Sequence, residues 1–136
     1  MLLKPEISCL EEAERNQLTQ LLESHFSACG EPLCVFSLSL DKETARKLWQ
    51  RDIEHFPWAE NYYEHMSSAP CIAIILGDRG SAHNLKRAIR NEMSQSISKI
   101  NGILGCDFIP DIVHGSDPDD GIIELQILVE VASGKP

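Results

Sequence analysis

A run of apolar residues, Cys71-Ile72-Ala73-Ile74-Ile75-Leu76, constrains the fold of this chain more than any other feature. Pro70 precedes the run and Gly77 follows it, and both residue types interrupt regular structure. A strand with apolar side chains in both directions is typical of a sheet that is covered on both faces. The run therefore predicts a central strand between covering layers, and the 136 residues of the chain suffice for one domain.

The segment before this strand begins with a predicted helix and a second strand. A capping-box pattern at Ser8 and Glu11 precedes apolar residues at helical spacing, which predicts a helix over Leu10–Cys29. Gly30 ends this helix, because glycine is favoured just past a helix C-terminus. From Leu33 to Leu40 apolar residues alternate with serines, which is the period of a half-buried strand.

Three more helices are predicted from their first residues. Asp41 and Ser81 are favoured N-caps, and Pro57 is favoured in a first turn. The predicted inner faces are Ala45, Leu48, Trp49 and Ile53, then Trp58, Tyr62 and Met66, and then Leu85, Ala88, Ile89 and Met93. The outer face of the last of these helices carries Lys86, Arg87 and Arg90.

The end of the chain is less regular. Residues 94–111 have no clear period, because glycines interrupt it, and Ile112-Val113 predicts the end of a strand before His114. Residues 121–131 fit a helix or a strand, and residues 132–136 are predicted to be a flexible tail. Together the elements predict an α+β sandwich with helices packed on a mostly antiparallel sheet.

Charge and hydropathy argue against two classes of partner. The formal net charge of −9 would repel a nucleic-acid backbone, whereas a small phosphate ligand needs only a local positive pocket. No apolar run approaches the roughly 20 residues that span a bilayer, and the start of the chain lacks a signal-peptide pattern. We therefore expect no nucleic acid, no membrane and a cytoplasmic location.

Cysteine and histidine spacing favours no metal site. The five cysteines are an odd number without a C-x-x-C pair, so neither a disulfide framework nor a zinc site is expected. Most of them lie in or beside apolar runs, where a reduced and buried thiol is the common role. The remaining histidines, His25, His55, His65 and His83, show no metal-ligand spacing.

Three segments of the chain follow the pattern of a known enzyme family. Ile112-Val113-His114-Gly115-Ser116-Asp117 resembles the signature of the nucleoside diphosphate kinases, in which an apolar strand precedes His-Gly-Ser-Asp. The stretch from Pro57-Trp58 through Ala69-Pro70 to Leu76 resembles its proline-aromatic helix, proline turn and buried strand, and Lys4-Pro5-Glu6 resembles the triplet that closes its first strand. The resemblance implies a ferredoxin-like antiparallel sheet with helices packed on one face, a truncated first strand and a single domain over residues 1–131.

The family's chemistry implies roles for individual residues. In this family a histidine takes the terminal phosphate of a nucleoside triphosphate and passes it to a diphosphate, with Mg²⁺ on the bound nucleotide. The resemblance makes His114 that catalytic residue, with Ser116, Asp117 and Glu124 as its supporting residues. It also implies nucleotide-binding roles for Lys4, Trp49, Trp58, Lys86 or Arg87, and Asp111.

The chain departs from the family pattern at three helper positions. Asn101, Asp111 and Leu125 stand where the family has a phosphate-binding arginine, a ribose-binding asparagine and the acid that orients the histidine. These departures leave the stabilising charges of the family site incomplete. The first hypothesis is therefore a module that binds a nucleotide or a protein, with weak or no phosphotransfer. The resemblance also implies a ciliary, flagellar or cytoskeletal location for such a module. The alternative is an active nucleoside diphosphate kinase that transfers a γ-phosphate through phospho-His114. Expected partners are nucleoside di- and triphosphates, another protein and a second copy of the chain in a homodimer.

Each site residue also has a structural interpretation, which the sequence leaves open. His114 could stand in a turn without chemistry, and Lys4 could be a solvated lysine near the start of the chain. Trp49 and Trp58 fall on helix faces beside other large side chains, where core packing competes with base stacking. Lys86 and Arg87, with Arg90, could equally form an exposed helix face.

Overall fold

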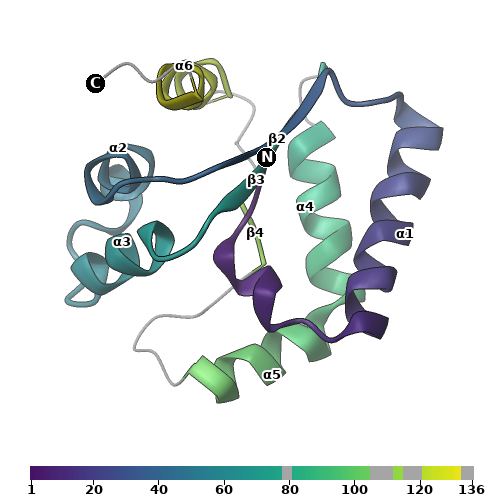
Figure 1. Cartoon of the computed structure of the whole chain (residues 1–136), viewed down its shortest axis with the longest axis horizontal. Coiled ribbons are helices and arrows are strands. Elements are labelled where there is room, and N and C mark those ends of the chain that lie inside the picture. Colours follow the sequence, from purple (N-terminus) through teal and green to yellow (C-terminus); the bar gives the residue numbers. More distant parts are fainter. Residues whose placement is uncertain (78–80, 105–111, 115–120, 133–136) are drawn as a thin grey trace.

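The computed structural model describes residues 1–77, 81–104, 112–114 and 121–132. Within these ranges the chain forms a four-stranded antiparallel sheet and six α-helices (Figure 1). The predicted α+β class is therefore confirmed. None of the described helices is both long and apolar enough to cross a membrane.

The sheet contains β1 (Leu2–Leu3), β2 (Cys34–Leu38), β3 (Cys71–Ile75) and β4 (Val113–His114) in the order β2-β3-β1-β4. The β3 strand pairs with β2 on one side and β1 on the other, so the predicted central strand is confirmed. The β1 strand lies between β3 and β4, and its residue Leu2 stands opposite both Ala73 and His114. The β1 strand is two residues long, so the prediction of a short first strand is confirmed.

The helices are α1 (Glu12–Cys29), α2 (Lys42–Ile53), α3 (Ala59–Ser67), α4 (Ser81–Glu92), α5 (Ser94–Leu104) and α6 (Gly121–Ala132), with a 3-10 helix, η1, at Pro5–Cys9. The four predicted helices are confirmed as α1 to α4, although α1 and α3 begin two residues later than expected. The α5 helix was not predicted. The segment that fits a helix or a strand by sequence is the helix α6, and it includes Ala132, so the prediction of a tail from residue 132 is wrong at that residue.

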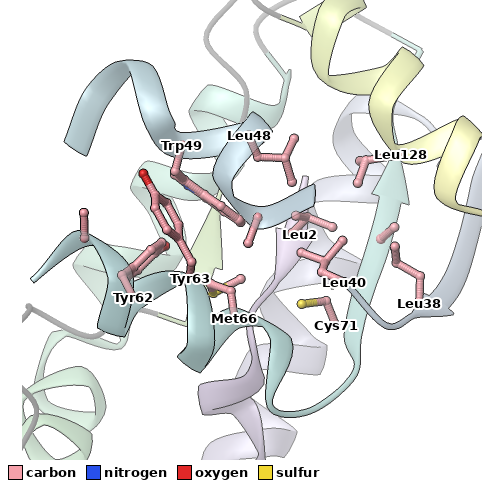
Figure 2. Packing of buried hydrophobic residues seen from close by; sticks show 13 residues of the cluster. Leu2, Leu38, Leu40, Leu48, Trp49, Tyr62, Tyr63, Met66, Cys71 and Leu128 are labelled. Atoms are coloured by element: carbon pink, nitrogen blue, oxygen red, sulfur yellow. The ribbon is translucent and has the colours of Figure 1, made fainter. Parts of the chain in front are cut away.

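Helices cover both faces of the sheet, so the expectation of helices on one face is wrong. In Figure 1, α1, α4 and α5 lie on one side of the strands and α2, α3 and α6 on the other. Each side has its own buried cluster, and neighbouring strand residues such as Leu2 and Leu3 contribute to opposite clusters. Figure 2 shows Leu2 and Cys71 of the sheet in one cluster with Trp49 of α2. Because β3 is apolar on both faces, both faces must be covered.

Two local details differ from the sequence-based expectations. Ser8 does not cap α1, because it lies in η1, where its hydroxyl donates to the Pro5 carbonyl. The capping contact belongs instead to Glu14, whose carboxylate accepts from the backbone N–H of Glu11 at 3.0 Å. Ala88 is exposed on α4 rather than buried with Leu85.

The predicted cap of α2 is confirmed, because the backbone N–H of Thr44 donates to Asp41 Oδ1 at 2.7 Å. Hydrogen bonds from Thr44 lower the pKa of Asp41. We expect Asp41→Ala to lower the free energy of unfolding by about 1 kcal/mol at pH 7. Since the folded pKa is depressed, this stabilisation is present above the unfolded pKa and is lost as pH falls through the folded pKa.

Urea unfolding at pH 7 and pH 3 measures this difference between wild type and Asp41→Ala, which should shrink at the lower pH. Asp41→Asn is the control, because asparagine still accepts the hydrogen bond and should cost less than alanine. An equal difference at both pH values would contradict a role for the ionised carboxylate.

Candidate functional site at His114

A cavity of about 250 Å³ opens beside His114, at the end of β4. It is formed where α2, α3, α4, β4 and α6 meet, beside the residue that follows β1. Its described lining residues are Lys4, Leu48, Trp49, Arg51, Asp52, Tyr62, Lys86, Arg90, Val113, His114 and Glu124. Five of the residues assigned to the site from the sequence, Lys4, Trp49, Lys86, His114 and Glu124, are therefore brought together here.

The ring of His114 is held by two neighbours. Its Nε2 lies 2.5 Å from Oε1 of Glu124, which stands in the first turn of α6. An ionised carboxylate can only accept, so Nε2–H donates, and in the neutral ring the lone pair is then on Nδ1. The edge of the Trp49 ring packs against the His114 ring, with centroids 5.1 Å apart. This arrangement fixes both the tautomer and the orientation of the imidazole.

Lys4 is not a solvated lysine, because the residue is only 4% exposed. Its Nζ lies 4.8 Å from the centre of the Tyr62 ring and 3.7 Å from Oε2 of Glu6. Lys4 immediately follows β1, whose pairing with β4 places it near His114. The short first strand thus delivers an ammonium group to the cavity.

Three further cations line the cavity, and they come from opposite faces of the sheet. Arg51 belongs to α2, whereas Lys86 and Arg90 lie one helical turn apart on α4. With Lys4, the described lining holds four cationic side chains against the two carboxylates of Asp52 and Glu124. A chain of net charge −9 therefore forms a locally positive pocket, which suits an anionic ligand.

Other predicted site residues lie elsewhere. Trp58 is absent from the lining and instead stacks on Phe56, with ring centroids 4.8 Å apart and an angle of 12° between the rings. Arg87 is exposed on α4 and does not line the cavity. Asp111, Ser116 and Asp117 lie outside the described residues.

Comparison of the sequence with protein-family models and with curated proteins assigns no family to the chain. No protein-family model matches the sequence, and no curated protein matches it. The resemblance to nucleoside diphosphate kinases stays a prediction that rests on the sequence of Lys4–Glu6, Pro57–Leu76 and Ile112–Asp117.

Sequence reasoning did not assign Arg51, Asp52 or Tyr62 to the site, and it placed Arg90 only on an outer helix face. One signal was available for Arg90, because it lies four residues after Lys86 and therefore on the same helix face. Arg51 lies two positions after Trp49, so helical spacing alone does not place it beside that ring. Only the approach of α2 to the end of β4 brings it to the cavity.

The described residues offer no dedicated metal site, since no group of three histidine, cysteine or acidic side chains is suitably placed among them. Mg²⁺ on a nucleotide takes most of its ligands from phosphate oxygens and water, so it needs few protein ligands. Of the two carboxylates in the described lining, Asp52 is the one that could contribute a ligand, because Glu124 is engaged by His114.

The prediction that most cysteines are buried is wrong for the described residues. Among the described residues Cys29 and Cys34 are exposed, Cys9 is half-buried and only Cys71 is buried, all as free thiols. Cys106 lies outside the described residues. Burial raises the pKa of the Cys71 thiol to about 11, and the nearby Glu6 carboxylate adds to the rise.

We therefore expect iodoacetamide at pH 8 to modify Cys71 at least about 100-fold more slowly than Cys29 or Cys34, because only the thiolate reacts. Peptide mass spectrometry over a time course measures the three rates. Urea should bring the rate at Cys71 close to the other two, which is the control for intrinsic reactivity. Similar rates in the folded protein would contradict the burial of Cys71.

Proposed function

We propose that the cavity binds the phosphates of a nucleoside triphosphate and that Nδ1 of His114 accepts the terminal phosphoryl group. The contact between His114 Nε2 and Glu124 carries this proposal, since it directs the lone pair to the other ring nitrogen. The four lining cations support it, because positive groups stabilise the charge that spreads over a transferring phosphoryl. Leu125 stands where the family has the acid that orients the histidine, and in this proposal Glu124, one residue earlier, takes that role.

In the proposed step, the Nδ1 lone pair forms a bond to the terminal phosphorus as the bond from that phosphorus to the bridging oxygen breaks. The electron pair of the broken bond leaves with the nucleoside diphosphate. The imidazole then carries a positive charge, which the Glu124 carboxylate stabilises through Nε2–H. A terminal oxygen of a second diphosphate attacks the same phosphorus, and Nδ1 regains its lone pair. Mg²⁺ on the nucleotide would neutralise part of the phosphate charge.

The strand order supports a nucleoside diphosphate kinase-like version of the ferredoxin-like fold. The order β2-β3-β1-β4, with every pairing antiparallel, fits a β-α-β-β-α-β core in which α1 and α4 are the crossover helices. These two helices contact each other on one face of the sheet. In this interpretation α2, α3 and α6 are additions that cover the other face and bring Trp49, Arg51 and Glu124 to the site.

A second candidate is a nucleotide- or protein-binding module without transfer, with the ciliary or cytoskeletal setting expected from the resemblance. Its support is the apolar outer surface of α6, where Ile123 and Val129 are 56% and 53% exposed. Such residues suit contact with another protein or a second copy of the chain.

Incubation with γ-labelled ATP and Mg²⁺ separates the two candidates. We expect an acid-labile, alkali-stable label on the peptide that contains His114, discharged by any added nucleoside diphosphate. ATP labelled at the α-phosphate is the control and should leave no label. A folded protein that binds ATP but takes no label from the γ-position would leave only the binding module.

A further inference from the structure

A buried carboxylate lies behind the cavity, outside the chemistry proposed for His114. The side chain of Glu6 is fully buried in η1, and its two oxygens have different partners. Oε2 lies 3.7 Å from Nζ of Lys4, and Oε1 lies 2.7 Å from Nε2 of His65 on α3. Lys4, Glu6 and His65 therefore form a connected polar group that begins at the cavity and ends at a half-buried histidine.

Burial of an ionised carboxylate is costly unless partners replace its water. Lys4 and His65 are such partners, and each approaches a different oxygen of Glu6. Cys71 adds no charge here, because the raised pKa of its thiol keeps it neutral near pH 7. The cost of burying Glu6 is thus offset by a geometry that also fixes the lysine.

Two side chains hold the ammonium group of Lys4 beside the cavity. Oε2 of Glu6 lies on one side of the group, and the face of the Tyr62 ring lies on another. A lysine side chain is long and flexible, so holding it in one rotamer before a ligand arrives removes an entropy cost from binding. Lys4 also lines the cavity, where a bound phosphate would meet its ammonium group.

We infer that Glu6 is a positioning residue that holds the Lys4 ammonium group at the cavity for phosphate binding. His65 contacts the other oxygen of the same carboxylate. Glu6 therefore holds the Lys4 side chain in place, and the ammonium group keeps part of its positive charge available for a phosphate. This inference rests on the proposed binding of a nucleoside triphosphate, and it adds two residues that touch neither the nucleotide nor His114.

The affinity of a non-hydrolysable ATP analogue tests the inference, and it can be followed by tryptophan fluorescence in a Trp58→Phe background, which leaves Trp49 at the cavity as the emitting residue. We expect Glu6→Gln to raise the Kd about tenfold, as loss of a pre-organised charged contact would do. The labelling rate at subsaturating ATP should fall at least as much, because less nucleotide is bound at the same concentration. Glu23→Gln, on the exposed face of α1, is the matched control for the loss of one carboxylate and should leave the Kd unchanged.

Coupling to Lys4 distinguishes positioning from general damage. Lys4→Met should raise the Kd at least as much as Glu6→Gln, and the double variant should bind no worse than Lys4→Met alone. His65→Ala removes the donor beside Oε1 of Glu6 and tests the same group if Glu6→Gln fails to fold. We expect it to raise the Kd about threefold in the Lys4 protein and not at all in Lys4→Met.

Two results would overturn the inference: an unchanged Kd in Glu6→Gln, or additive effects of the Lys4 and Glu6 substitutions. Failure of the proposed function gives a different pattern. If the wild-type protein binds the analogue but takes no γ-label, the proposed transfer step is wrong and the inferred role of Glu6 in binding stands. A folded wild-type protein that does not bind the analogue would overturn both proposals.

Discussion

Replacement of Glu124 by glutamine should lower the rate of phosphohistidine formation at His114 about 100-fold, with little change in nucleotide affinity. Glutamine has nearly the same shape, so the contact with Nε2 can persist, but the neutral amide no longer stabilises the positive imidazole. Its amide can also turn its NH₂ group toward the ring, which favours the wrong tautomer. The effect therefore falls on the chemical step rather than on binding.

Rapid-quench labelling with saturating γ-labelled ATP measures the rate in each variant. His114→Ala sets the baseline, because it should take no acid-labile label. Glu130→Gln is the matched control, since Glu130 is exposed on the same helix and lies outside the cavity lining. A Glu124→Gln rate within about threefold of wild type would remove Glu124 from the mechanism.

Ile89→Ala should lower the free energy of unfolding by about 3–4 kcal/mol. Ile89 is fully buried between α4 and the sheet, so truncation loses apolar burial and leaves a cavity. Such a loss is a large part of the total stability of a domain of this size. The α4 helix also carries Lys86 and Arg90, so its packing on the sheet holds two of the lining cations in place.

Urea unfolding followed by circular dichroism measures this loss. Leu33→Ala is the control, because Leu33 is 73% exposed and its truncation should change the free energy by less than about 0.5 kcal/mol. A loss below about 1 kcal/mol for Ile89→Ala would contradict the packing of α4 against the sheet.

Most of the fold could be predicted because its elements carry strong local signals. The apolar run at Cys71–Leu76 and the cap at Asp41 each identify an element without reference to the rest of the chain. The α5 helix has no such signal, because serines and a glycine weaken its helical propensity and its buried Ile100 gains stability only from tertiary packing. In α6, apolar side chains occur on nearly every face, so no period distinguishes helix from strand.

The site could be predicted only in part, for a similar reason. A resemblance identifies positions within a motif, and Lys4 and His114 are such positions. Trp58 matches a motif position, but its ring packs on Phe56 outside the cavity. Arg51 belongs to no motif and reaches the cavity through the packing of α2 near β4, which depends on contacts between distant segments.

The lengths of the strands have a consequence for how the sheet opens. Among the described residues, five pairs join β2 to β3, whereas two join β1 to β3 and two join β1 to β4. Amide protons at the β1–β4 edge should therefore exchange with solvent through a lower-energy local opening than those of the β2–β3 ladder. Lys4 and His114 are attached to that weaker edge. A ligand that contacts both residues would stabilise the pairing of β1 with β4. Ligand binding should therefore slow amide exchange in β1 and β4 and change it little in β2.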